Sequence, residues 1–277
     1  MSEERIPLAG VIGCPISHSR SPILHGHWLK RYGIKGHYIP MHVEPDNLER
    51  VLRTMPEMGF VGCNITIPHK VSALEIADMV SDRASLIGAA NTLIFRADGK
   101  IQADNTDGYG FMANLRQKAP DWDPTTGPAL VLGAGGASRA ILTAMLDAGT
   151  PEILLTNRTR TNSDALRDEF GARIRVVEWV HAGAAMGECD TVINTTSLGM
   201  KGANEFKVPT NQLRSGTLVT DIVYNPLRTK LLYEAEQMGC VTVDGLGMLL
   251  HQAVPGFERW FGKRPEVDDD LRAAVLG

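Results

Sequence analysis

A glycine-rich segment in the middle of the chain has the spacing of a phosphate-binding turn. The apolar run 129–132 ends in it, and a helix is expected to follow. A strand that ends in such a turn presents backbone N–H groups and the positive helix end to an anion. The pattern therefore predicts that a dinucleotide binds here through its pyrophosphate. The residues of the turn are Gly133, Ala134, Gly135, Gly136 and Ala137.

The end of the next expected strand, 152–156, indicates which dinucleotide it is. An NAD-binding unit usually carries an acidic residue there for the ribose 2′-hydroxyl, but this chain has Asn157, Arg158 and Thr159. A guanidinium matches the geometry of a phosphate and would attract the 2′-phosphate of NADP. The sequence thus predicts NADP(H) as cofactor. The alternative is a glycine turn that serves packing alone and an Arg158 that is a solvated surface charge.

Lys70 and Asp107 are candidates for proton transfer. Lys70 follows the expected strand 61–67 and lies in the first turn of the next helix, where a cation is disfavoured by about 0.3–1 kcal/mol. The same field favours the neutral amine, the form that can accept a proton. Asp107, before the expected helix 108–118, would orient that amine if the two were adjacent. Each also has a plain structural alternative, a solvated lysine and a helix N-cap.

Two serines on one turn are candidates for binding a carboxylate. Ser19 and Ser21 alternate in the segment before Pro22, so both hydroxyls can donate to one anion without adding charge. Ser followed by Pro is also the ordinary start of a helix, and this alternative stays open.

Strands alternate with helices along the whole chain, which predicts an α/β fold with two domains. A Pro- and Gly-rich stretch at 120–128 indicates a surface loop before the glycine turn, and the domain boundary is placed near 107. Asp98-Gly99 is typical of a tight hairpin turn. In the first domain we expect strands at 7–12, 37–41, 61–67, 92–96 and 100–103, and helices at 22–32, at 47–58 and near 71.

The second domain reads as a doubly wound, mostly parallel sheet. Its strands are expected at 129–132, 152–156, 175–177, 191–194, 218–221 and 240–244, with a helix at 163–170 among the connections. Two helices, 247–261 and 268–275, end the chain.

Composition favours small-molecule chemistry. The 277 residues are 43% hydrophobic and 22% charged with a formal net charge of −4, and no basic run suggests a nucleic acid or a membrane surface as partner. Cys14, Cys63, Cys189 and Cys240 lack the spacing of metal ligands or redox pairs, and the histidines show no ligand pattern, so no metal is expected. The start Met1–Arg5 leads straight into a strand rather than a signal sequence. A cytoplasmic protein with reduced thiols is the prediction.

Six short segments occur in the order seen in shikimate dehydrogenases, and the chain resembles that family over essentially its full length. No single segment is specific, but all six in order are. They are Ser19-Arg20-Ser21-Pro22, Asn64-Ile65-Thr66-Ile67-Pro68-His69-Lys70, Gly88-Ala89-Ala90-Asn91-Thr92, Asn105-Thr106-Asp107-Gly108, Gly133-Ala134-Gly135-Gly136-Ala137 and Asp244-Gly245-Leu246-Gly247-Met248.

The resemblance implies NADPH-dependent reduction of 3-dehydroshikimate to shikimate, on the way to chorismate and the aromatic amino acids. It implies a substrate-binding domain with a mixed sheet, 1–107 completed by the returning helices 248–277, and a Rossmann-type NADP domain at 108–247. A monomer or homodimer is expected. Lys70 and Asp107 would be the catalytic pair. Ser19, Ser21 and Tyr224 would bind the substrate carboxylate, and Thr66, Asn91, Asp107 and Gln252 the ring hydroxyls. Asn194, Thr195 and Thr196 would approach the nicotinamide, and Gly245 and Met248 would line its pocket.

One departure and three alternatives accompany this resemblance. Many NADP-dependent relatives carry a second arginine a few residues after the Asn-Arg-Thr turn, whereas here Arg160 follows directly and either replaces it or is merely solvated. The alternatives are a quinate/shikimate dehydrogenase with relaxed substrate and cofactor choice, a dehydrogenase of another small substrate, and a non-catalytic metabolite-sensing relative. The presence of Lys70 and Asp107 argues against the last.

Overall fold

The computed structural model describes residues 6–277 and divides the chain into two units. The first unit holds the residues up to Thr106 together with Leu250–Gly277, and the second holds Asp107–Leu249. The sequence placed these boundaries at 107/108 and 247/248. The predicted start of the chain at Met1–Arg5 lies outside the described residues.

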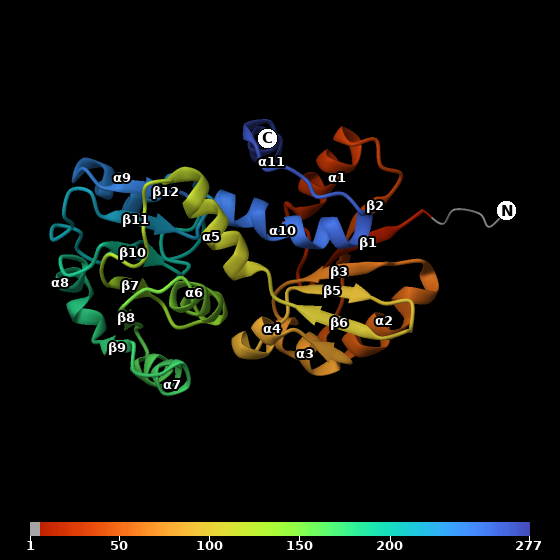
Figure 1. Cartoon of the computed structure of the whole chain (residues 1–277), viewed down its shortest axis with the longest axis horizontal. Helices are drawn as coiled ribbons and strands as arrows, with labels where there is room; N and C mark the ends of the chain where they lie inside the picture. The colour runs from red at the N-terminus through yellow and green to blue at the C-terminus, as the bar shows by residue number, and fades with distance from the viewer. Residues whose placement is uncertain (1–5) are drawn as a thin grey trace. The chain divides into compact units, whose positions relative to one another are not determined.

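The first unit contains the predicted mixed sheet, which has six strands rather than the five expected (Figure 1). Its order is β2-β1-β3-β5-β6-β4; β1 runs parallel to β2 and β3, while β5 runs antiparallel to β3 and β6. Gly99, at φ +81°, makes the predicted tight turn between β5 and β6. The strands are β1 Leu8–Gly13, β2 His37–His42, β3 Gly62–Ile65, β4 Met79–Val80, β5 Thr92–Phe95 and β6 Ile101–Asp104.

Helices cover both faces of this sheet. Leu52 and Ala73, from α2 and α3, belong to an apolar core with Ile65 and Leu93 of the strands. An aromatic cluster forms elsewhere in the unit from α1 and α10, where the indole of Trp260 donates to the Leu93 carbonyl at 3.1 Å. The helices are α1 Ser21–Arg31, α2 Leu48–Thr54, α3 Lys70–Ile76, α4 Asp82–Ile87, α10 Leu246–Phe261, whose residues from Leu250 belong here, and α11 Asp269–Leu276.

Two segments of the first unit differ from expectation. The single helix predicted at 47–58 is α2 followed by a 3₁₀ turn at Met55–Met58, because Pro56 has no N–H to continue the α-helical hydrogen bonds. The short pair β4 and α4 was not predicted. Ser81 caps α4 by accepting from the Ala84 N–H at 3.3 Å, a short-range signal that the apolar periodicity does not carry.

The second unit contains the predicted parallel sheet, in the order β12-β11-β10-β7-β8-β9. This order reverses on either side of β7, which is the doubly wound arrangement. The strands are β7 Ala129–Leu132, β8 Ile153–Thr156, β9 Ile174–Val177, β10 Thr191–Asn194, β11 Leu218–Asp221 and β12 Val241–Val243. The helices are α5 Asp107–Lys118, α6 Gly136–Asp147, α7 Arg160–Phe170, α8 Ala182–Met186 and α9 Lys230–Gln237.

Alternation along the buried strands builds a three-layer unit. In β7, Val131 packs with Phe111 of α5 and Ile141 of α6, whereas Leu130 packs in a second cluster with Leu231 of α9. Strands covered on both faces read as continuous apolar runs, which is why their positions were predicted closely. The helix expected at 163–170 begins earlier, at Arg160, and α8 and α9 were not predicted. Among the described residues, no helix combines the length and apolar character needed to cross a bilayer.

Candidate active site

Most of the predicted substrate residues of the first unit gather at one edge of its sheet. The segments that leave β1, β3 and β6 start from this edge, and the antiparallel β5 enters from it. Ser19 and Ser21 follow β1, Thr66 and Lys70 follow β3, and Asn91 directly precedes β5. The topology therefore brings together side chains that lie up to 72 residues apart in the sequence.

A buried hydrogen-bond network fixes the orientation of Asn91. Its Oδ1 accepts from the Thr106 N–H and from the Thr92 hydroxyl, both at 2.9 Å. Its Nδ2 thereby points toward Gln252, whose Oε1 lies 3.4 Å away. The Thr106 hydroxyl donates to the Gln252 carbonyl at 2.8 Å, so the network also holds α10 at this edge. Satisfied buried networks of this kind rigidify a site, because every partner would be costly to leave unpaired.

Two further members of the network, Tyr38 and Asn64, were missed by the sequence reasoning. The buried Tyr38 hydroxyl donates to Asn64 Oδ1 at 2.7 Å, and Asn64 Nδ2 donates to the Asn91 carbonyl at 3.1 Å. Burial raises the pKa of Tyr38 well above its ordinary value, and its hydroxyl also hydrogen-bonds Ser21. A chain of contacts thus connects Ser21 to Asn91. A tyrosine in an edge strand gives no local sequence signal for such a role.

The two serines differ in their surroundings. Ser21 is 7% exposed and is the first residue of α1, and Ser19 Oγ accepts from its N–H at 3.3 Å. Arg20 occupies the N-cap position without a side-chain capping bond, so neither serine is the N-cap of α1. Ser19 hence braces the turn, and the Ser21 hydroxyl lies among buried polar groups.

Lys70 and Asp107 each begin a helix. Lys70 is the first residue of α3, directly after the N-cap His69, as the sequence predicts. Asp107 is the first residue of α5 rather than its cap, and its exposed fraction is 9%. It belongs to the second unit, whereas Lys70 belongs to the first.

The glycine turn follows β7 in the second unit and opens α6. Gly133 has φ +110°, and a Cβ there would lie 2.6 Å from Thr195 Oγ1, so only glycine fits. At Gly135 and Gly136 a Cβ would meet nothing within 4 Å, which leaves this backbone open to a ligand. No side chain of residues 6–277 caps α6 at Gly135. The first N–H groups of α6 are thus suited to a pyrophosphate.

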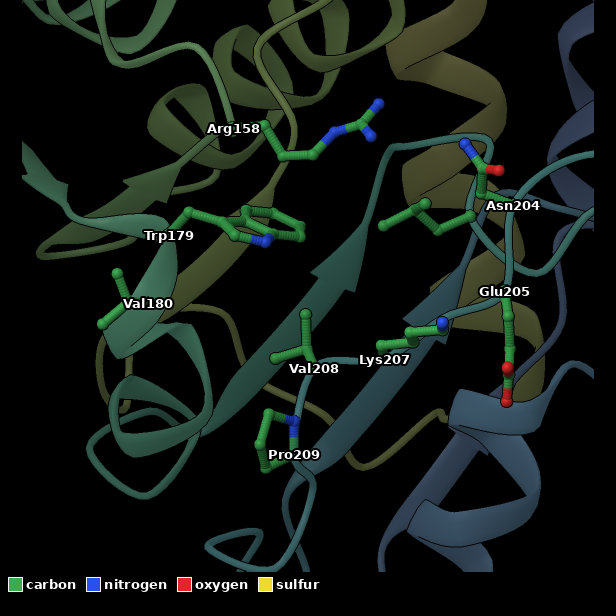
Figure 2. A pocket seen from close by; sticks show the side chains of 9 residues that line it. Arg158, Trp179, Val180, Asn204, Glu205, Lys207, Val208 and Pro209 are labelled. Carbon is green, nitrogen blue, oxygen red and sulfur yellow. The ribbon is translucent and has the colours of Figure 1, made fainter.

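A pocket of about 500 Å³ lies beyond the carboxyl ends of β8, β9 and β10, on the same side as the glycine turn. Figure 2 shows Arg158 and Asn204 on one side of it and Val208 and Pro209 on the other. Its full lining is Arg158, Trp179, Val180, Leu198, Asn204, Glu205, Lys207, Val208 and Pro209. An indole ring with two cations suits a nucleotide carrying an extra phosphate.

The charges around this pocket favour an anion. Glu205 is bound by Lys230, Nζ to Oε1 at 2.8 Å, and this contact lowers the pKa of the carboxyl. Within residues 6–277 no side-chain ion pair within 4.0 Å engages Arg158 or Lys207, although the charge of Lys207 also contributes to lowering the pKa of Glu205. Arg160, by contrast, is paired with Asp164 at 3.3 Å and with Glu178. Lys207 is hence the second cation of the pocket, and it was missed because it lies 49 residues beyond Arg158.

The remaining residues of the Asn-Arg-Thr turn shape its backbone. Asn157 Nδ2 donates to the Thr159 carbonyl at 3.0 Å, and Thr159 is the N-cap position of α7 with no side-chain capping bond among the described residues. This turn places Arg158 between β8 and α7.

The buried carboxylate of Asp221 holds the loop after β10 in place through Asn194. Asn194 Nδ2 donates to Asp221 Oδ1 at 3.0 Å, and Asn194 Oδ1 accepts from the Thr196 hydroxyl at 2.7 Å. The Thr195 hydroxyl donates to the Leu132 carbonyl at 2.8 Å, which ties this loop to the glycine turn. Burial raises the pKa of Asp221 to about 6, although three donors oppose this effect.

The start of α10 is held close to the sheet of the second unit. A Cβ on Gly245 would lie 2.4 Å from the Ile222 carbonyl oxygen, so glycine is required there. Met248 is half-buried and packs against the core of this unit. Tyr224 is half-buried in the segment after β11.

Comparison with known proteins finds family models that match three successive segments of the chain. A family model described as shikimate dehydrogenase substrate binding domain matches residues 11–93. Models described as shikimate/quinate 5-dehydrogenase and shikimate 5′-dehydrogenase C-terminal domain match residues 116–246 and 245–275.

Solved structures with the same fold cover nearly the whole chain. The Thermus thermophilus shikimate 5-dehydrogenase, in complex with NADP(H) and shikimate, is 34% identical with a TM-score of 0.86, over 98% of both chains. A quinate dehydrogenase from Corynebacterium glutamicum, in complex with NAD, is 28% identical with a TM-score of 0.91, over 98% of this chain and 99% of that one. The shikimate dehydrogenase (NADP(+)) of Cereibacter sphaeroides is 66% identical over 272 residues, 98% of each chain, and the protein belongs to the shikimate dehydrogenase family.

Proposed function

We propose that this protein catalyses the reversible reduction of 3-dehydroshikimate to shikimate with NADPH, a step in the synthesis of chorismate and the aromatic amino acids. The observation that carries this proposal is the 66% identity, over 98% of both chains, to an enzyme named shikimate dehydrogenase (NADP(+)). The chain retains a glycine turn that fits a pyrophosphate, a cationic pocket and a polar sheet edge, the three sites that the reaction needs.

The cofactor side of the proposal rests on the second unit. Residues 133–137 bind the pyrophosphate through backbone N–H groups, and Asn157, Arg158 and Thr159 bind the 2′-phosphate. Lys207 adds a second cation to the same pocket, which compensates for the absent downstream arginine. Asn194, Thr195 and Thr196 approach the nicotinamide, and Gly245 and Met248 line its pocket.

The substrate side rests on hydrogen bonds that can satisfy a polyhydroxylated ring acid. Ser19 and Ser21 bind the carboxylate together with Tyr224, and Thr66, Asn91, Asp107 and Gln252 bind the ring hydroxyls. The fixed amide of Asn91 supports its part, because Thr92 and Thr106 bond to its oxygen and thereby direct its N–H₂ group toward Gln252. A site built from such donors rejects analogues that leave them unpaired.

The proton of the reaction is assigned to Lys70 and Asp107. NADPH, when bound, supplies the hydride, and the ketone oxygen then needs one proton to become the alcohol. Lys70 gives this proton from Nζ, and Asp107 is the second member of the catalytic pair.

The experiment that tests this function is a spectrophotometric assay at the NADPH absorbance band. Initial rates are measured in the oxidative direction with shikimate or quinate as substrate and with NADP or NAD as cofactor. We expect the highest kcat/KM for shikimate with NADP. A preference for quinate with NAD would favour the alternative that the Corynebacterium glutamicum neighbour represents. No turnover with any pair, despite cofactor binding, would favour a metabolite-sensing relative.

We place this activity in the cytoplasm and in a monomer or homodimer. Cys63 and Cys189 are fully buried free thiols, which behave as small apolar side chains and suit a reducing compartment. Analytical ultracentrifugation of the full chain measures the oligomeric state directly.

A further inference from the structure

Cys14, His42 and Glu44 converge at the corner of the first unit where β1 and β2 end. Cys14 Sγ lies 3.6 Å from His42 Nε2 and 3.5 Å from Glu44 Oε2, and His42 Nε2 lies 3.0 Å from Glu44 Oε1. One ligand atom from each residue lies within 4.8 Å of the others. We propose that these three side chains form a binding site for a single Zn²⁺ ion, with water in the fourth position.

The backbone holds the three residues in place. Gly13 pairs with His42 across the parallel strands, so Cys14 directly follows this pair. The Val43 N–H donates to the Gly13 carbonyl at 3.3 Å, and the Val43 carbonyl contacts the buried His69 Nε2 at 2.8 Å. Glu44 is extended, with φ −67° and ψ 146°, so residues 42 and 44 direct their side chains to the same side of the chain.

The separation between the sulfur and the imidazole nitrogen matches the one that zinc requires, and the carboxylate lies within reach. Zn–S bonds of about 2.3 Å and Zn–N and Zn–O bonds of about 2.0–2.2 Å at a tetrahedral angle place sulfur about 3.5 Å from nitrogen or oxygen, and nitrogen about 3.4 Å from oxygen. The observed Sγ–Nε2 distance of 3.6 Å agrees with this geometry. Glu44 reaches the two other ligands through different oxygens, Oε2 to the sulfur at 3.5 Å and Oε1 to the imidazole at 3.0 Å, so its carboxylate rotates to place one oxygen on the ion.

The chemistry of the donors favours zinc over other cations. Thiolate and imidazole are soft or borderline ligands that Mg²⁺ and Ca²⁺ avoid, and a thiolate with a carboxylate balances the charge of a divalent ion. The rival interpretation is a cysteine nucleophile activated by histidine. It fails because His42 meets both neighbours with the same nitrogen, whereas a relay needs both ring nitrogens.

The site escapes sequence inspection because its members are distant in the chain. Cys14 and His42 are 28 residues apart, and no recognised ligand spacing relates them. Our expectation that the chain binds no metal rested on such spacings alone. The pairing of β1 with β2 brings these residues together in space, which the spacings do not reveal.

The test uses the full-length protein, purified without a polyhistidine tag and treated with a chelator that is then removed. Titration with Cd²⁺ should produce one equivalent of thiolate-to-metal charge-transfer absorption, and Zn²⁺ should displace it. Isothermal titration with Zn²⁺ gives the affinity and the stoichiometry. A thermal shift with and without Zn²⁺ provides an independent readout, because a ligand that binds only the folded state raises Tm.

Three variants and one control decide the outcome. Cys14→Ser should abolish the absorption band, and His42→Ala and Glu44→Gln should weaken Zn²⁺ binding by more than the roughly 10–100-fold that loss of an outer-shell partner costs. Cys240→Ser is the matched control, because Cys240 is the other partly exposed cysteine and belongs to the second unit. An absorption band that survives Cys14→Ser, or equal affinity of Cys14→Ser and the unchanged protein for Zn²⁺, would overturn the proposal.

Discussion

The two units present their candidate ligand groups by different means. In the first, Asn91 and Ser21 are side chains oriented by other buried side chains, with Tyr38, Asn64 and Thr106 as intermediaries. In the second, the candidate pyrophosphate site consists of main-chain groups in a glycine-rich turn. One of its glycines has no room for a Cβ, and two others face open space.

This difference predicts where each unit tolerates change. A side-chain network fixes which hydroxyls and amides a substrate meets, so single substitutions can change substrate choice or remove the chemistry. A main-chain turn binds any dinucleotide, and only the cations beside it distinguish one from another. Substitutions in the side-chain network of the first unit should hence affect kcat and the substrate KM, and those at the glycine turn and the Arg158 pocket should affect the cofactor Kd.

The largest effect is expected at Lys70. Lys70→Ala removes the proposed proton donor and should lower kcat by about 10²–10⁴-fold, about 3–5 kcal/mol of transition-state stabilisation, because a general acid acts only as the proton moves. The Kd for NADP, measured by fluorescence titration, should stay within about twofold, since a group acting only in the transition state adds little to ground-state binding.

Lys100→Ala is the matched control for that substitution. Lys100 is an exposed lysine in the turn between β5 and β6 of the same unit. Its loss should leave both quantities unchanged. If Lys70→Ala retained the kcat of the unchanged protein, or weakened NADP binding instead, the assignment of the reaction's proton to Lys70 would be wrong.

The sequence predicts the second unit better than the first for a physical reason. A strand buried on both faces is an apolar run, and a turn that requires positive φ needs glycine, so β7, β10 and Gly133 are all visible in short windows. The network around Asn91 depends on which strands pair. Tyr38 and Asn64 are 26 residues apart and meet only because β2, β1 and β3 lie side by side. Lys207 was missed likewise, because a long connection returns it to the pocket of Arg158.

The first unit also carries a buried base without a hydrogen-bond partner. His25 is stacked on Tyr38 at 3.8 Å between ring centroids, neither ring nitrogen has a partner among the described residues, and burial lowers its pKa to about 3. Below pH 6.5 the unfolded chain binds a proton there that the folded chain does not, so stability falls as pH falls toward 3. The loss is at most about 4 kcal/mol between pH 6.5 and 3.5.

His25→Phe should remove this acid sensitivity, because phenylalanine keeps the stacking and has no titratable nitrogen. Urea unfolding at a series of pH values measures the change in slope. The exposed His37→Gln serves as control. A slope that is unchanged in His25→Phe would mean that the folded protein charges His25 after all.

The second unit carries a buried acid whose effect on stability has the opposite pH dependence to that of His25. Burial raises the pKa of Asp221 to about 6, so between about pH 4 and 6 the folded chain binds a proton that the unfolded chain has lost. The contribution of Asp221 to the free energy of unfolding is therefore full below pH 4 and is lost as pH rises toward 6. This loss is at most about 3 kcal/mol. The contributions of His25 and Asp221 oppose each other over this range.

Asp221→Asn should make the free energy of unfolding rise more steeply with pH between about 4 and 6. The substitution removes the contribution of Asp221, which falls with pH, and leaves that of His25, which rises with pH. Urea unfolding at pH 4.5 and 6 measures the difference in free energy, with the exposed Asp147→Asn as control. The comparison uses the change between two pH values, so any constant loss from the replaced oxygen cancels. The same pH dependence in Asp221→Asn and the unchanged protein would contradict the prediction.

The smallest expected effect sharpens the comparison most, since it separates the two cofactors at the pocket of the second unit. Arg158→Gln removes the planar donor set expected at the 2′-phosphate and should weaken NADP binding by roughly 10–30-fold, about 1.4–2 kcal/mol. Lys207→Gln removes a more mobile charge and should cost less. Binding of NAD should change little in either variant, because NAD lacks the phosphate.

Arg160→Gln is the matched control, since its guanidinium is already paired with Asp164 and Glu178. Equal losses for NADP and NAD would show that Arg158 supports the fold of the turn rather than the choice of cofactor.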